Sequence, residues 1–63
     1  MSKHRRYISI RLARDIATGE AEAYDDEEVL RAWQSLVRTG EIKRMSPNVQ
    51  TQAIRLRRGA LIT

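Results

Sequence analysis

The chain has 63 residues, no cysteine and a formal net charge of +4. This length suits one domain, and a domain this short buries only about 60% of its unfolded surface. The missing cysteines exclude disulfide bonds and thiolate metal ligands, and a single histidine disfavours a zinc site. No apolar run approaches the ~18 residues that cross a membrane, so we expect no membrane partner and a cytoplasmic location.

Charge is divided into three blocks along the chain. Residues 1–14 hold five basic residues and no acidic one, whereas residues 15–28 hold seven acidic residues and no basic one. Residues 29–63 hold seven basic residues and one acidic residue. Because such a chain can pair its own blocks on folding, the net charge alone does not predict a polyanionic partner.

Residues 1–6 are predicted to form a flexible basic arm. The behaviour of chain ends favours a solvated terminus. The alternative is an arm that contacts nucleic-acid phosphates through Lys3, Arg5 and Arg6. His4 has no acidic or serine neighbour in sequence, and we interpret it as a tail residue, not as a catalytic base.

The next segment has two competing periodicities. Polar and apolar residues alternate over residues 7–12, which is typical of a strand. Ile8, Leu12 and Ile16 also recur every four residues, which indicates a helix that ends before Gly19. The helical pattern is longer, so we predict a helix over residues 8–17 and keep the strand as the alternative for residues 7–12.

A complete helix signature covers residues 25–39. Asp25 is predicted to cap the helix in a capping box with Glu28, and Tyr24 is predicted to pack on Val29 as a hydrophobic staple. One apolar stripe at helical period follows, made of Val29, Leu30, Trp33, Leu36 and Val37. Gly40 is predicted to end the helix in the left-handed conformation.

The acidic residues before and at the start of this helix have two interpretations. Carboxylates in a cluster are typical of acid–base catalysis or of Ca²⁺ and Mg²⁺ sites. The helix start already explains residues 25–28, because negative charge is favoured in the first turn. The spacing also lacks the alternating ligands and central glycine of a calcium loop. We therefore predict no metal site, no cofactor and no enzymatic activity.

The third predicted helix covers residues 47–58. Ser46 and Pro47 are typical of a helix start, and Gly59 is predicted to stop the helix. Its narrow core side comprises Val49, Ala53, Leu56 and Ala60, flanked by Ile54 and Leu61. Ile42 and Met45 are predicted to plug the preceding loop, and residues 60–63 to fold back as a short extended end. The predicted fold is an all-α three-helix bundle, helix-turn-helix-like, with Trp33 at its centre.

Two resemblances rest on these motifs. The end of the last helix resembles that of a winged helix-turn-helix domain. Most of the chain resembles a family of short uncharacterised proteins of tailed bacteriophages, through Gly19-Glu20, Asp26-Glu27-Glu28, Trp33-Gln34, Leu36-Val37 and Thr39-Gly40. The chain departs from that family over residues 47–52 and is basic where the family tends to be acidic. Membership implies a phage origin, hence the host cytoplasm, and a small helical domain, but no particular activity.

The outer face of the last helix carries the functional prediction. Arginine pairs with guanine and phosphate, and asparagine and glutamine pair with adenine, so we predict a regulatory nucleic-acid-binding protein. The predicted site comprises Asn48, Gln50, Thr51, Gln52, Arg55, Arg57 and Arg58, with Lys3, Arg5, Arg6, Lys43 and Arg44. The alternative is a module that docks on a host or phage protein and modulates it. The small core also leaves a homodimer open.

Overall fold

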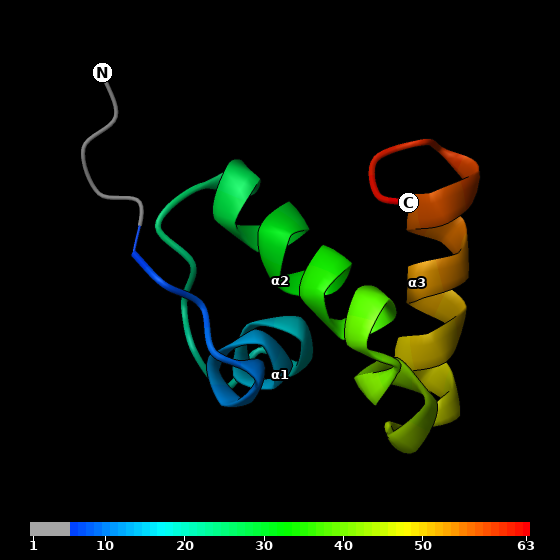
Figure 1. Ribbon diagram of the computed structural model, residues 1–63, viewed down its shortest axis with the longest axis horizontal. Coiled ribbons are helices and arrows are strands. Elements are labelled where there is room, and N and C mark those ends of the chain that lie inside the picture. The colour runs from blue at the N-terminus through cyan, green and yellow to red at the C-terminus, as the bar shows by residue number, and fades with distance from the viewer. Residues whose placement is uncertain (1–5) are drawn as a thin grey trace.

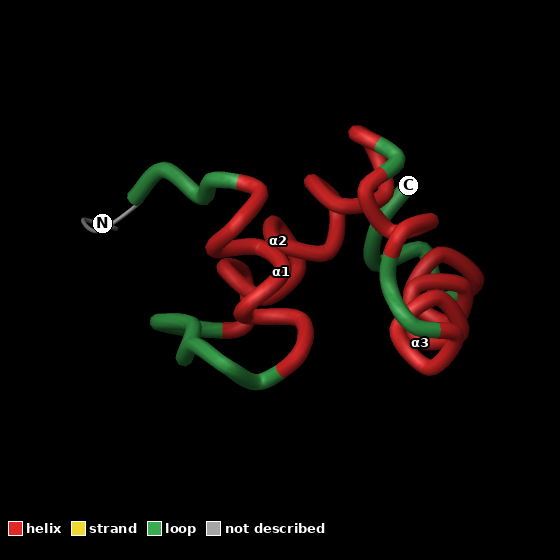
Figure 2. The backbone as a smooth tube through the Cα atoms, turned by 90° about the horizontal axis from the view of Figure 1, so that it is seen from below, coloured by secondary structure: helices red, strands yellow, loops and turns green. Residues whose placement is uncertain are grey.

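Three α-helices and one short 3-10 helix make up the computed structural model, which describes residues 6–63. The elements are α1 (Ile10–Thr18), α2 (Asp26–Thr39), η1 (Glu41–Arg44) and α3 (Pro47–Arg58). Helix α2 crosses the middle of the molecule, with α1 on one side and α3 at the other end (Figure 1). In the perpendicular view α3 is seen nearly end-on and stands apart from α1 (Figure 2). The predicted all-α three-helix bundle is confirmed.

Helix α1 starts two residues later than predicted. Ser9 has extended backbone angles, and its Oγ accepts a hydrogen bond from the Leu12 amide at 3.1 Å, so it caps the helix. Ile8 therefore precedes the helix, although its side chain is buried. No strand forms within residues 6–63, so the strand alternative for residues 7–12 is wrong. Gly19 ends α1 with a φ of 86°.

Helix α2 follows its predicted bounds closely. Asp25 Oδ1 accepts a hydrogen bond from the Glu28 amide at 2.9 Å, and Gly40 ends the helix with a φ of 82°. The capping box is altered, because Glu28 Oε1 accepts from the Tyr24 amide at 2.8 Å and not from the amide of the cap residue. The predicted staple is absent from the core, since the exposed Tyr24 ring stacks on Arg6 instead.

Helix α3 has the predicted bounds but different ends. Pro47 opens the helix after Ser46, whose side chain makes no capping hydrogen bond. The Gln50 side chain reaches back instead, and its Nε2 donates to the Met45 carbonyl at 2.9 Å. At the far end Gly59 has a φ of −82°, and the left-handed residue is Ala60, with a φ of 61°.

The core consists of two clusters that share α2 as a wall. The first joins α1 to α2 and contains Ile8, Ala13, Ile16, Ala32 and Leu36. The second joins α2 to α3 and contains Trp33, Ala53 and Ile62. Ile42 packs against both clusters, as expected for a plug under the loop. Burial of Ile62 confirms that the C-terminal end folds back on the bundle.

Candidate nucleic-acid interface

The outward face of α3 is polar because the helix has little to bury. Ala53 is its one buried residue, and only Val49 and Leu56 pack beside it on the second cluster. The predicted site residues that lie exposed on this helix are Asn48, Thr51, Gln52, Arg55, Arg57 and Arg58. Within residues 6–63 none of these side chains takes part in a hydrogen bond or an ion pair. All their donors therefore face solvent.

Two further predicted residues, Lys43 and Arg44, are exposed on η1. This short helix packs against the start of α3, so both cations stand at the end of the molecule where α3 begins. Asn48 and Gln52 also border a shallow depression of about 390 Å³ that reaches Trp33 and the end of α1. The structure thus brings the α3 and η1 members of the predicted site onto connected elements.

Gln50 does not belong to this outward face. Its side chain is partly buried, and its amide nitrogen is used by the Met45 carbonyl. The glutamine therefore holds the loop before α3, but as a donor to a carbonyl it does not replace a serine cap, which accepts from a backbone amide. Gln50 is thus less exposed than the other predicted site residues of α3.

Arg6 is also placed differently from its prediction as part of a flexible arm. Its Nε donates to Glu28 Oε2 at 2.8 Å and its Nη2 to Glu28 Oε1 at 2.7 Å. The same Nη2 donates to the Glu22 carbonyl at 3.2 Å, and the guanidinium lies 3.9 Å from the Tyr24 ring centroid. Arg6 therefore ties the N-terminal segment to α2. Lys3, Arg5 and His4 lie outside the described residues.

Both partners of this contact have shifted pKa values. The hydrogen bonds from Arg6 lower the pKa of Glu28 below its ordinary value, against the opposing effect of burial. The tyrosine amide and the charges of Arg6 and Arg31 act in the same direction as the hydrogen bonds. The hydrogen bond to Glu28 raises the pKa of Arg6. Glu28 is consequently a charged carboxylate at neutral pH, and both of its oxygens accept hydrogen bonds.

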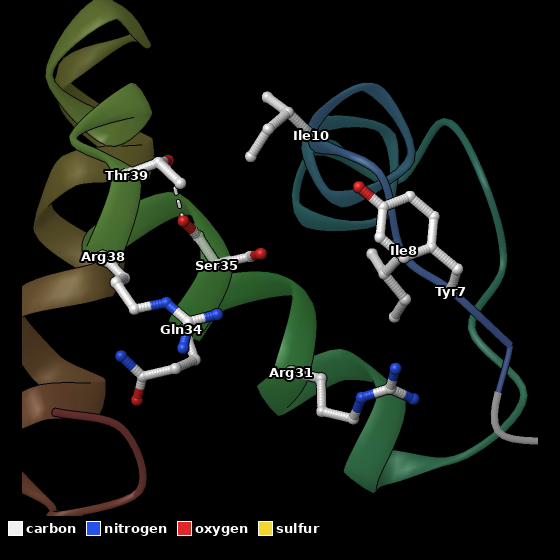
Figure 3. Close-up of a pocket in the computed structure, with 8 residues that line it drawn as sticks. All are labelled: Tyr7, Ile8, Ile10, Arg31, Gln34, Ser35, Arg38 and Thr39. Atoms are coloured by element: carbon white, nitrogen blue, oxygen red, sulfur yellow. Dashed lines mark hydrogen bonds between the residues drawn. The ribbon is translucent and has the colours of Figure 1, made fainter.

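Sequence reasoning missed a groove of about 540 Å³ between the N-terminal segment and α2 (Figure 3). It is lined by Tyr7, Ile8, Ile10, Arg31, Gln34, Ser35, Arg38 and Thr39. The signal was readable on α2, because Arg31, Gln34 and Arg38 recur at helical spacing opposite the apolar stripe. What the sequence did not indicate is that residues 7–10 form the facing wall.

Within residues 6–63 no group of three or more histidine, cysteine or acidic side chains is placed to hold a metal ion. No helix in the same range is long and apolar enough to span a membrane. Comparison of the chain with models of protein families, with curated proteins and with solved structures finds no match.

Proposed function

We propose that this protein is a small phage-type accessory protein that binds nucleic acid through α3, in a helix-turn-helix-like manner and with a regulatory role. One observation carries the proposal. The three arginines of α3 are exposed and have no acidic partner within residues 6–63. A guanidinium group left without a partner on a helix that buries little is available to phosphates and base edges.

The pairing of the charge blocks supports this reading. The Arg6–Glu28 pair and the Arg14–Glu41 pair, at 3.4 Å, both take their basic residue from the N-terminal block. Arg14 thereby occupies Glu41, the one acidic residue of the C-terminal block. The α3 arginines therefore keep their charge uncompensated by close contacts. Such a basic patch raises the local concentration of a polyanion and speeds its association.

The test is an anisotropy titration of labelled duplex DNA at low salt. Arg55→Ala and Arg58→Ala should each weaken binding and leave the melting temperature unchanged, because both side chains are exposed and unpaired. If each contacts a phosphate, the slope of log K against log salt becomes shallower by about one unit. Arg11→Ala, an equal loss of charge at an exposed position of α1, is the control and should change the slope less. Absence of binding at tens of micromolar protein would contradict the proposal.

A second candidate function, docking on a host or phage protein, is favoured by a different observation. Ile54 and Leu61 are 52% and 56% exposed, and Ile54 borders a depression with Arg57 and Arg58. Apolar side chains ringed by arginine are typical of protein interfaces. Trp33 does not contribute, because only 6% of it is exposed. Binding through this patch should weaken far less with salt than binding to nucleic acid.

A further inference from the structure

The groove between the N-terminal segment and α2 is a second surface with its own chemistry. One wall comes from residues 7–10 and the other from a single face of α2, and Tyr7 and Arg31 point toward one another across the space between them (Figure 3). No residue of α3 lines it. Its volume of about 540 Å³ lies within the range of sites that hold small ligands.

Tyr7 is the residue of this groove that most requires an explanation. Its side chain is 84% exposed, the highest value among the large hydrophobic residues of the described chain. The next residue, Ile8, is buried in the first core cluster and fixes the backbone beneath the ring. The aromatic face is thus held at the edge of the groove and open to solvent, which is the arrangement of a stacking platform.

The α2 wall supplies positive charge from Arg31 and Arg38. Arg31 and Arg38 are separated by seven residues, about 10.5 Å along the helix axis. No carboxylate lines the groove. Arg31 is oriented in advance, since its Nη2 donates to the Arg6 carbonyl at 2.9 Å and Arg6 is itself held by Glu28. Glu28 lies near enough to offset part of this charge, but its oxygens already accept from Arg6 and Tyr24.

Gln34, between the two arginines, is oriented by the C-terminal end. Its Oε1 accepts from the backbone amide of Thr63 at 2.7 Å and from the hydroxyl at 3.1 Å. In Figure 3 this amide is turned away from Tyr7, toward the C-terminal end. The groove therefore combines an aromatic ring, an isoleucine floor and donors whose positions are set before a ligand arrives. Such preorganisation reduces the entropy that binding costs.

We propose that this groove binds unpaired nucleotides of a single-stranded nucleic acid, with a base stacked on Tyr7 and the adjoining phosphates at Arg31 and Arg38. The site is separate from α3. It could bind single strands even if α3 did not bind duplex DNA. An acidic peptide would satisfy the arginines but would make no use of the exposed ring. The combination of ring and guanidinium groups is what favours a nucleotide.

The experiment is an anisotropy titration of the full chain with a labelled six-nucleotide oligothymidylate at low salt. Tyr7→Ala should weaken binding about five-fold or more, as loss of one stacked base does, and Tyr7→Phe should restore it. Arg38→Ala should weaken binding and make the salt slope shallower by about 0.7 unit. Both side chains are exposed, so the thermal melts of these variants should match that of the unmodified protein.

Two controls separate this proposal from the one for α3. Arg11→Ala removes the same charge from an exposed position of α1 that does not line the groove, and it should leave hexanucleotide binding within two-fold of the unmodified protein. An abasic oligomer with the same number of phosphates should bind at least five-fold more weakly than oligothymidylate. Equal binding of the abasic oligomer, or of a polyaspartate peptide, would overturn the stacking site. Loss of hexanucleotide binding in Arg58→Ala with retention in Tyr7→Ala would assign that binding to α3.

Discussion

At the scale of single residues, the buried carboxylate of Glu28 is the most demanding group of the fold. The residue is 2% exposed, and a buried charge without partners is strongly unfavourable. Here each oxygen has an N–H donor from Arg6, and the Tyr24 amide supplies a third hydrogen bond. No buried side-chain polar atom lacks a partner in the described part of the chain. Removing one member of this contact therefore leaves the other buried and unsatisfied.

The depressed pKa of Glu28 makes a prediction for stability against pH. A carboxylate whose pKa is lower in the folded state stabilises the fold above its unfolded value, here the ordinary 4.5. That stabilisation is lost as the pH falls below 4.5 and then through the lower pKa that Glu28 has in the folded state. Glu28→Gln should therefore melt at a lower temperature at pH 7, and its melting temperature should fall less steeply than that of the unmodified protein below pH 4.5.

Thermal melts between pH 7 and pH 2.5 measure this effect. Glu20→Gln is the matched control, because Glu20 is exposed and its side chain forms no hydrogen bond or ion pair with another described residue. Below pH 4.5 the melting temperature of Glu20→Gln should fall as steeply as that of the unmodified protein. If the melting temperatures of Glu28→Gln and the unmodified protein fall equally steeply below pH 4.5, the Arg6 contact does not stabilise the fold.

At the scale of the helices, the end of α3 departs from the rule that glycine takes the left-handed position. Gly59 has an ordinary backbone conformation, and Ala60, the following residue, has the positive φ. The Leu61 amide then donates to the Leu56 carbonyl at 3.0 Å, which closes the helix. An alanine in this conformation is strained, because its Cβ lies too close to the following carbonyl oxygen.

Exchanging the two residue types should therefore stabilise the protein. Ala60→Gly should raise the free energy of unfolding by roughly 0.5–1 kcal/mol, because relief of the left-handed strain exceeds the added entropy of the unfolded chain. Gly59→Ala should be neutral or stabilising, since its Cβ would meet nothing closer than 3.6 Å. Urea denaturation of each variant measures both. Destabilisation by Ala60→Gly would show that position 60 is not left-handed in solution.

Local signals predicted the helices well and their surroundings poorly. The bounds of α2 and α3 follow from Asp25, Gly40 and Pro47, whose effects are confined to the neighbouring turn. The start of α1 was misplaced because the Ser9 cap competes with the helical spacing of Ile8. Arg6 and Glu28 are 22 residues apart, and no local pattern identifies that contact. The groove was missed for the same reason, since its two walls come from separate segments.

At the scale of the whole molecule, α2 is the element on which both core clusters depend. Leu36 faces the α1 cluster and Trp33 faces the α3 cluster, so the two ends of the molecule pack on different sides of one helix. Among residues 6–63 the second cluster has three buried members, and the two besides Trp33 are Ala53 and Ile62. The attachment of α3 therefore rests largely on one indole ring.

Trp33→Ala should lower the free energy of unfolding by about 3–5 kcal/mol, the cost of truncating a buried aromatic residue. For 63 residues the total stability is on the order of 3–9 kcal/mol, so the variant is at or near the limit of folding. If it folds, amide hydrogen exchange should show a larger loss of protection in α3 than in α1, because the first cluster remains intact.

Ile54→Ala, at an exposed position of α3, is the control and should change stability by less than about 0.5 kcal/mol. For Trp33→Ala, equal loss of protection in α1 and α3 would mean that the two clusters unfold as one unit. An unchanged melting temperature of this variant would mean that Trp33 is not buried.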